Sequence, residues 1–209
     1  MRRELWCATS NAGKLREFQH AAGQDFLLQG LPPQPCPEEG RTFEENAVSK
    51  ALCYSQALDG GPTGASRLVF ADDSGLEVDA LGGAPGVLSA RFAGPGADDE
   101  ANNRLLLAKL DGLPVAERAA RFVCCIALCR QGLLLRTFHG EARGRILERP
   151  LGSGGFGYDP LFYFPPLEKT FAQLSPEEKG RHSHRGQAFR KMLEWIRQEQ
   201  ASSGHDATS

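Results

Sequence analysis

The chain lacks long hydrophobic runs and any marked excess of charge of one sign, and both absences exclude classes of protein. Its longest strongly apolar run is the eight-residue stretch Phe122–Cys129, whereas a membrane-spanning helix needs about 18 to 20 apolar residues. Its 24 lysines and arginines face 26 aspartates and glutamates, which leaves a net charge of −2. A protein that grips the nucleic-acid backbone needs a basic surface. We therefore expect neither a membrane partner nor a nucleic-acid partner.

The chain also lacks paired-cysteine motifs and an apolar N-terminal segment. None of its six cysteines has C-x-x-C spacing, so the sequence indicates neither a zinc site nor a redox motif. Four of them lie in apolar stretches, where a cysteine is usually a small buried hydrophobic residue. The segment Met1–Cys7 has no apolar stretch of signal-peptide length, and a chain of 209 residues needs no disulfide to hold its core. These features predict a cytoplasmic protein.

Apolar runs and helical spacing alternate along the chain. Short buried runs predict strands at 5–8, 68–71, 121–130 and 133–138. Helical spacing and two capping boxes, Thr42–Glu45 and Ser175–Glu178, predict helices that begin near 14, 42, 101, 176 and 184. This order predicts an α/β fold with a mixed sheet. The polar residues 201–209 are expected to form a flexible tail.

The loop Thr9–Lys14 lies between a predicted strand and a predicted helix, which is a natural seat for an anion. Free backbone N–H groups and the helix dipole attract negative charge there, and Lys14 adds a positive charge. The loop is not a Walker A motif, which would require Gly at Ala8 and Ser or Thr at Leu15. A plain capped helix with a solvated lysine is the alternative.

Two acids, Asp72 and Asp73, come directly after the apolar strand 68–71. They are expected at its carboxyl end, where α/β proteins bind their ligands. Adjacent strand residues point to opposite faces, so the two carboxylates are expected to do different jobs. One of them is a candidate ligand for Mg²⁺, which prefers oxygen. An Asx-type turn with solvated acids is the alternative.

Glutamates also cluster around the start of the second predicted helix, at Glu38, Glu39, Glu44 and Glu45. Glu45 belongs to the capping box, which favours a helix-capping role. Glu38 lies in the preceding proline-rich loop and is freer to reach a metal. Spacing alone does not choose among the four.

Two further segments contain residues that suit ligand binding. The loop 152–157 contains a G-x-G-x-x-G pattern, but it neither follows a strand nor opens a helix, as a dinucleotide fingerprint must. Its aromatic residue Phe156 and the following Tyr158 are able to lie over a flat ligand such as a base. Lys179–Arg185 gathers cationic groups near a helix N-terminus, where the helix dipole disfavours them. That position indicates an anionic or acceptor-rich partner. The alternative for the glycine loop is a tight turn with core aromatics, and the alternative for Lys179–Arg185 is a solvated surface run.

With these motifs in order, the sequence resembles the non-canonical purine NTP pyrophosphatase family, also called inosine triphosphate or XTP/dITP pyrophosphatases. Five collinear blocks carry the resemblance, from residue 8 to about 190: ATSNAGK, TFEENA, ADDSGL, LGGAPGV with SARF, and GGFGYDP with SHR. Each block is weak alone, and their common order makes the match specific.

The resemblance implies an elongated mixed β-sheet with flanking helices, arranged as two lobes of one domain (1–200) around a central cleft. It implies a homodimer that needs Mg²⁺. It also implies hydrolysis of the nucleoside triphosphates dITP, ITP and XTP to the monophosphate and pyrophosphate, which removes deaminated purines from the nucleotide pool.

Carried over to this sequence, the resemblance makes Asp73 the proton acceptor and a Mg²⁺ ligand. It makes Glu38 the second ligand, with Glu39 and Glu45 as alternatives. It assigns the remaining substrate contacts to the triphosphate seat, the base wall and the basic segment: Thr9, Ser10, Asn11, Ala12, Gly13, Lys14, Ser74, Phe156, Gly157, Tyr158, Asp159, Lys179, His184 and Arg185.

Three rival interpretations stay open at this point. A related pyrophosphatase would act on another modified or pyrimidine nucleotide. A non-catalytic nucleotide-binding protein on the same scaffold is disfavoured by the Asp72–Asp73 pair, because a binder has no need of a hydrolytic base. An NAD-dependent oxidoreductase would depend on the glycine pattern, whose context fails.

Overall fold

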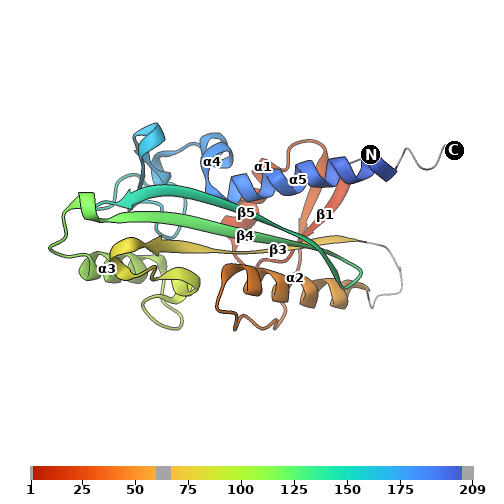
Figure 1. Ribbon diagram of the computed structural model, residues 1–209, viewed down its shortest axis with the longest axis horizontal. Helices are drawn as coiled ribbons and strands as arrows, with labels where there is room; N and C mark the ends of the chain where they lie inside the picture. Colours follow the sequence, from red (N-terminus) through yellow and green to blue (C-terminus); the bar gives the residue numbers. More distant parts are fainter. Residues whose placement is uncertain (1, 60–66, 204–209) are drawn as a thin grey trace.

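The computed structural model describes residues 2–59 and 67–203 (Figure 1). Its strands are β1 (Arg3–Cys7), β2 (Phe26–Gly30), β3 (Leu68–Val78), β4 (Ala119–Arg130), β5 (Leu133–Ile146), β6 (Phe162–Phe164) and β7 (Lys169–Thr170). Its α-helices are α1 (Ala12–Ala21), α2 (Phe43–Asp59), α3 (Asp99–Lys109), α4 (Pro176–His182) and α5 (His184–Ser203).

The seven strands form one mixed sheet in the order β2-β1-β3-β4-β5-β6-β7. Strands β1, β2 and β3 are parallel to one another, and every later neighbour is antiparallel. The long strands β3, β4 and β5 run along the longest axis of the molecule, with α2 and α3 on one side and α1, α4 and α5 on the other (Figure 1). The predicted α/β class with an elongated mixed sheet and flanking helices is confirmed.

Side-chain alternation along β3 divides the core. Phe70 packs with Phe18 of α1 and Phe189 of α5, whereas its neighbours Val69 and Ala71 pack in the cluster that α2 covers. The same alternation continues in β4, so even-numbered residues near its centre face α5 and odd-numbered ones face α2. A third cluster fills the far end of the sheet, around β6 and α3. This parity decides which side of the sheet each polar residue of β3 reaches.

The structure corrects several expected boundaries. Strand β3 does not end before the acids but continues to Val78, pairing residue for residue with β4. The acids are tolerated inside the strand because cations and an amide on the covering helices contact them, as described below. Strands β2, β6 and β7 were not expected; they contain only five, three and two residues, too few to show a clear alternation. Helix α5 continues through Ser203, so the expected tail is helical at 201–203, and 204–209 lie outside the described residues.

The cysteines divide into two groups. Cys7, Cys124, Cys125 and Cys129 are free and buried, as expected of small hydrophobic residues. Cys36 and Cys53, however, form a disulfide that was not expected and that ties the proline-rich loop to α2. No helix within 2–59 or 67–203 is long and apolar enough to cross a membrane.

Candidate active site

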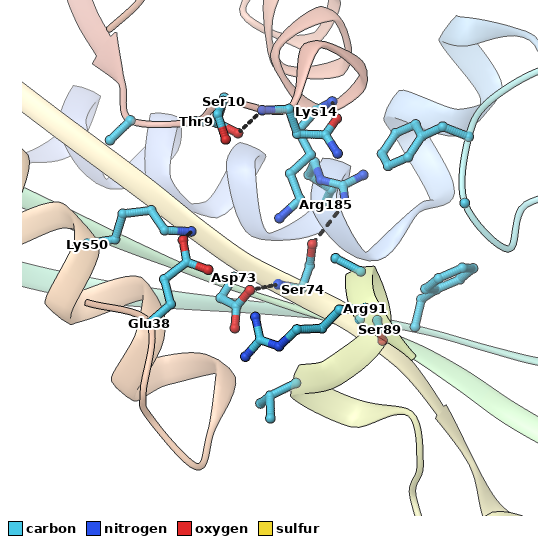
Figure 2. Close-up of a pocket in the computed structure, with 18 of the residues that line it drawn as sticks. Thr9, Ser10, Lys14, Glu38, Lys50, Asp73, Ser74, Ser89, Arg91 and Arg185 are labelled. Atoms are coloured by element: carbon cyan, nitrogen blue, oxygen red, sulfur yellow. Dashed lines mark hydrogen bonds and ion pairs between the residues drawn. The ribbon is translucent and has the colours of Figure 1, made fainter. Parts of the chain in front are cut away.

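A cleft of about 380 Å³ lies beside the middle of β3 (Figure 2). Its walls come from the β1–α1 loop and the start of α1, the proline-rich loop, α2, β3, the short helical turn Gly86–Arg91, α3, β4, the β5–β6 loop and the start of α5. Most of the predicted site residues line it: Thr9, Ser10, Asn11, Lys14, Glu38, Asp73, Ser74, Phe156, Gly157, Tyr158, Asp159, His184 and Arg185. The structure therefore brings together residues that are up to 176 positions apart in the sequence.

The β1–α1 loop presents the N-terminus of α1 to this cleft. Asn11 is the N-cap residue, and its side-chain oxygen accepts a hydrogen bond from the backbone N–H of Lys14 at 3.0 Å. The Thr9 hydroxyl in turn accepts one from the N–H of Asn11 at 3.2 Å. These bonds hold the loop that the sequence analysis proposed as an anion seat.

Asp72 is a buried negative centre on the α1/α5 side of β3. Its carboxylate lies 2.9 Å from Lys14 Nζ and 3.6 Å from Arg185 Nε, and it accepts a hydrogen bond from the Ser74 hydroxyl at 3.0 Å. Burial alone would raise the pKa of Asp72, but Lys14, Arg185 and Lys50 bring it down to about 2. Asp72 is therefore ionised at neutral pH and holds two of the cleft's cations in place.

Asp73 points to the opposite side of β3 and lines the cleft. Its Oδ2 accepts a hydrogen bond from Asn46 Nδ2 of α2 at 3.0 Å, and its Oδ1 accepts one from the N–H of Ser74. Burial raises the pKa of Asp73, although Lys14 and the bond from Asn46 oppose the increase. The two adjacent acids thus point to opposite faces of the sheet, as expected, although they lie within the strand and not after it. That they have different roles stays a prediction.

The proline-rich loop brings Glu38 to the same part of the pocket as Asp73 (Figure 2). Glu38 pairs with Lys50 of α2 at 2.6 Å. Glu45 instead caps α2, with its carboxylate on the N–H groups of Arg41 and Thr42. Of the four clustered glutamates, Glu38 is the one that lines the cleft. This position favours Glu38 over Glu39 and Glu45 as the candidate second metal ligand.

The β5–β6 loop carries an aromatic wall. The Phe156 ring lies so close to Gly13 that a Cβ there would fall 2.6 Å from its Cδ1 atom. The buried Asp159 carboxylate accepts the N–H of Phe156 at 2.9 Å, and the Tyr158 hydroxyl donates to the carbonyl of Ser89 at 2.9 Å. Gly13 thus supports the wall and, like Ala12, does not line the cleft. The glycine pattern of this loop opens no helix.

Cations back the aromatic wall. The Phe156 ring has Lys179 Nζ 5.1 Å from its centroid and the Arg185 guanidinium carbon 5.4 Å from it. Both cations pair with Glu17 of α1, and Lys179 also pairs with Asp159. Lys179 lies outside the lining of the main cleft, in an adjoining hollow. It therefore supports Phe156 from behind.

His184 lines the cleft as a buried, uncharged ring. It stacks on Phe122 with centroids 4.7 Å apart, and it is 2% exposed. Burial lowers the pKa of His184 well below its ordinary value, and the charges of Arg185, Lys179 and Lys14 lower it further.

Sequence reasoning missed several residues of this site. Asn46 and Lys50 lie one helical turn apart on α2, a spacing that places them on one face, but neither type alone indicated a site. Ser89 and Arg91 also line the cleft, although the matched SARF block had been given no role. Glu17 follows Lys14 by three residues on α1, and this spacing was the available signal.

Comparisons with known proteins identify the family of the chain. Residues 5–195 match the model of the Ham1 family. A dITP/XTP pyrophosphatase of Acidobacterium capsulatum is 50% identical over 202 residues, covering 90% of this chain and 96% of that protein. One of Gloeobacter violaceus is also 50% identical, over 92% and 94% of the two chains. The Staphylococcus aureus Ham1 protein structure aligns with a TM-score of 0.79 and 41% identity, over 94% of this chain and 100% of that chain. The resemblance read from the motifs is therefore confirmed, and the chain belongs to the Ham1 family.

Proposed function

We propose that this protein is a nucleoside triphosphate pyrophosphatase that hydrolyses dITP, XTP and ITP to the monophosphate and pyrophosphate. Relatives at 50% identity over most of the chain are dITP/XTP pyrophosphatases. The observation that carries the proposal is the different setting of the two adjacent carboxylates on β3. Asp72 is locked among cations on one side, while Asp73 is held by an amide and a backbone N–H in the cleft.

The residues around Asp73 fit Mg²⁺ by their chemistry. Mg²⁺ prefers hard oxygen ligands and keeps several of its waters, and Asp73 and Glu38 offer carboxylate oxygens in one cleft. Each Asp73 oxygen accepts one hydrogen bond, which leaves lone pairs for a ligand. We propose these two residues as its ligands. When bound, Mg²⁺ would neutralise phosphate charge.

The chain's own groups divide the reaction among them. The N-terminus of α1, Ser10 and Lys14 bind the triphosphate through N–H groups, a hydroxyl and a positive charge. Asp73 orients a water and accepts its proton as the water oxygen attacks the α-phosphorus. The bond from the α-phosphorus to the bridging oxygen breaks, and pyrophosphate leaves. Such transfers depend mainly on positioning and charge neutralisation.

The aromatic wall accounts for binding of a purine. Phe156 offers a flat face for stacking, held by Gly13 behind it and by Asp159 at its N–H group. Hypoxanthine and xanthine carry a 6-oxo acceptor where adenine carries an amino donor. Backbone N–H groups, and the N–H groups of Arg185 that Glu17 and Ser74 do not occupy, would be left unpaired against adenine, which disfavours adenine strongly.

We further propose a homodimer located in the cytoplasm, where the nucleotide pool is. A reducing cytoplasm would keep some of the Cys36–Cys53 pair as dithiol. Sedimentation of the purified chain tests the dimer, and fractionation of the source cells tests the location.

Pyrophosphate release with Mg²⁺ is the test of function, with dITP and XTP compared against dATP, dGTP and dTTP. Preference for dITP and XTP is the expected result, and preference for another nucleotide would change the substrate but keep the mechanism. Asp73→Asn should lower kcat at least about 100-fold, whereas the exposed control Asp111→Asn should not. Near-normal turnover by Asp73→Asn would remove Asp73 from its proposed role.

A further inference from the structure

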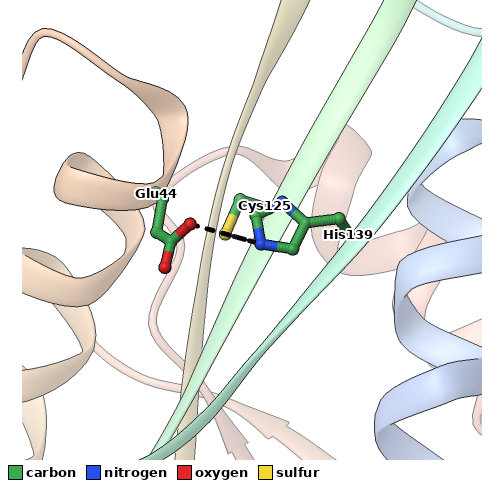
Figure 3. A group of neighbouring side chains, drawn as sticks. All are labelled: Glu44, Cys125 and His139. Carbon is green, nitrogen blue, oxygen red and sulfur yellow. Dashed lines mark hydrogen bonds and ion pairs between the residues drawn. The ribbon is translucent and has the colours of Figure 1, made fainter.

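Three side chains of types that can bind a metal, from three different elements, lie close together on the α2 side of the sheet, outside the cleft (Figure 3). They are Glu44 in the first turn of α2, Cys125 of β4 and His139 of β5. Cys125 and His139 are direct partners in the β4–β5 register, so their side chains lie on the same face. Glu44 reaches Cys125 and His139 from α2. The grouping is fixed by secondary structure and does not depend on a loop.

The distances among the ligand atoms suit one small metal ion. His139 Nε2 lies 3.3 Å from Glu44 Oε2 and 3.9 Å from Cys125 Sγ, and all three ligand atoms lie within 4.8 Å of one another. A tetrahedral Zn²⁺ with ordinary bond lengths separates a nitrogen from an oxygen ligand by about 3.4 Å and from a sulfur ligand by about 3.6 Å. Small side-chain shifts would therefore complete the geometry.

The surroundings suit an ion that keeps one open position. Cys125 is 1% exposed, whereas the side chains of His139 and Glu44 are 54% and 51% exposed, so an ion would enter from the solvent side. The other Glu44 oxygen accepts a hydrogen bond from Thr137 at 3.2 Å. Such an outer contact orients a ligating carboxylate.

The donor set selects the class of metal. A thiolate, an imidazole and a carboxylate suit Zn²⁺ or a similar transition metal and do not suit Mg²⁺, which takes oxygen ligands. We propose that Glu44, Cys125 and His139 bind one Zn²⁺-class ion, with water as the fourth ligand. This site is separate from the oxygen-only site of Asp73 and Glu38, and it does not depend on the proposed function.

The proposed metal site lies beside Asp73 of β3. Asp73 pairs with Cys125, and Cys125 pairs with His139, so the three residues form a row across β3, β4 and β5 on one face. On α2, Glu44 lies two residues before Asn46, the partner of Asp73. Occupancy therefore ties the first turn of α2 to the sheet next to Asp73.

Titration of the full chain with Co²⁺, without reductant, tests the proposal. A thiolate ligand gives tetrahedral Co²⁺ a charge-transfer band in the near ultraviolet, which an oxygen-only site cannot give. We expect a band that saturates at one equivalent and is abolished by Zn²⁺ but not by excess Mg²⁺. His139→Asn and Glu44→Gln change exposed side chains, so folding is retained, and each should weaken or abolish the band. Cys125→Ser should abolish it.

Matched variants separate this site from other cysteines and histidines. Cys129→Ser changes another buried thiol of β4, His20→Asn changes another exposed histidine, and Cys36→Ser/Cys53→Ser removes the disulfide. All three should keep the band. A band that survives both Cys125→Ser and His139→Asn, or no band in the unaltered protein, would overturn the proposal.

Discussion

The substitution Asp72→Asn isolates the structural half of the carboxylate pair. Asparagine keeps the shape of the side chain but removes the negative charge that lies beside Lys14 and Arg185. Because Asp72 is 1% exposed, water cannot replace the lost charge. Lys14 loses its ion pair with Asp72, and the buried Arg185 keeps only its pair with Glu17. The variant is therefore expected to lower the free energy of unfolding.

The pKa of Asp72 gives the size of this loss. Its pKa falls from 3.8 to about 2 in the folded protein, and each unit corresponds to about 1.4 kcal/mol. Ionised Asp72 thus contributes about 2 kcal/mol of stability at neutral pH. Since the folded pKa is the lower one, this contribution is fully present well above pH 4 and is lost as the pH falls towards 2, with about half remaining near pH 3.

Urea unfolding followed by tryptophan fluorescence measures this effect. At pH 7, Asp72→Asn should lose about 2 kcal/mol relative to the unaltered protein, and the difference should shrink as the pH is lowered from 5 towards 3. The exposed control Asp111→Asn should change little at either pH. Equal stability of Asp72→Asn and the unaltered protein at pH 7, or a difference that grows in acid, would refute the assignment of Asp72 as the buried counter-ion.

Two further substitutions test how the cleft is held. Gly75→Ala would place a Cβ 2.4 Å from Ser89 Oγ and 2.5 Å from the carbonyl oxygen of Gly86, so it should lower the unfolding free energy by at least about 1–3 kcal/mol; unchanged urea unfolding would contradict this crowding. Cys36→Ser/Cys53→Ser should lower it by about 3 kcal/mol, from a 17-residue separation, and should raise the Mg²⁺ concentration needed for half-maximal activity. The same metal requirement with and without the disulfide would exclude an effect on Glu38.

Local signals in the sequence were sufficient for much of the framework. The capping boxes at Thr42 and Ser175 each begin a helix as expected, and the Gln131-Gly132 turn joins β4 and β5. Period-two alternation placed Asp72 and Asp73 on opposite faces. Each of these depends on residues within a few positions of one another, which is the range over which propensity acts.

The corrections concern interactions between distant segments. The apolar run predicted a strand that ends at Ala71, but a charge inside a strand is tolerated where it is paired. The pairing comes from Lys14 and Arg185, more than a hundred positions apart, and no local pattern predicts it. Cys36 and Cys53 similarly belong to different segments, a loop and a helix. Only the fold brings the Cα atoms of these two cysteines to 6.0 Å from each other.

The missed Lys50 has the same physical origin. A lysine on a helix is normally solvated, but the side chain of Lys50 is 13% exposed because the proline-rich loop folds over it and supplies Glu38. Burial by itself would lower the pKa of Lys50, but Asp72, Glu38 and Asp73 raise it. Lys50 therefore stays charged, and its ammonium group lies among Glu38, Asp73 and Asp72.

The loop that carries Glu38 is anchored to α2 on both sides of that residue. The disulfide joins Cys36 to the helix before it, and the N–H of Gly40 donates to Asn46 Oδ1 at 2.8 Å after it. Asn46 uses its amide nitrogen to hold Asp73, so one side chain positions both the loop and the proposed base. A ligand in an anchored loop loses little conformational freedom when it binds a metal. Folding of α2 against β3 therefore preorganises Glu38 and Asp73 together.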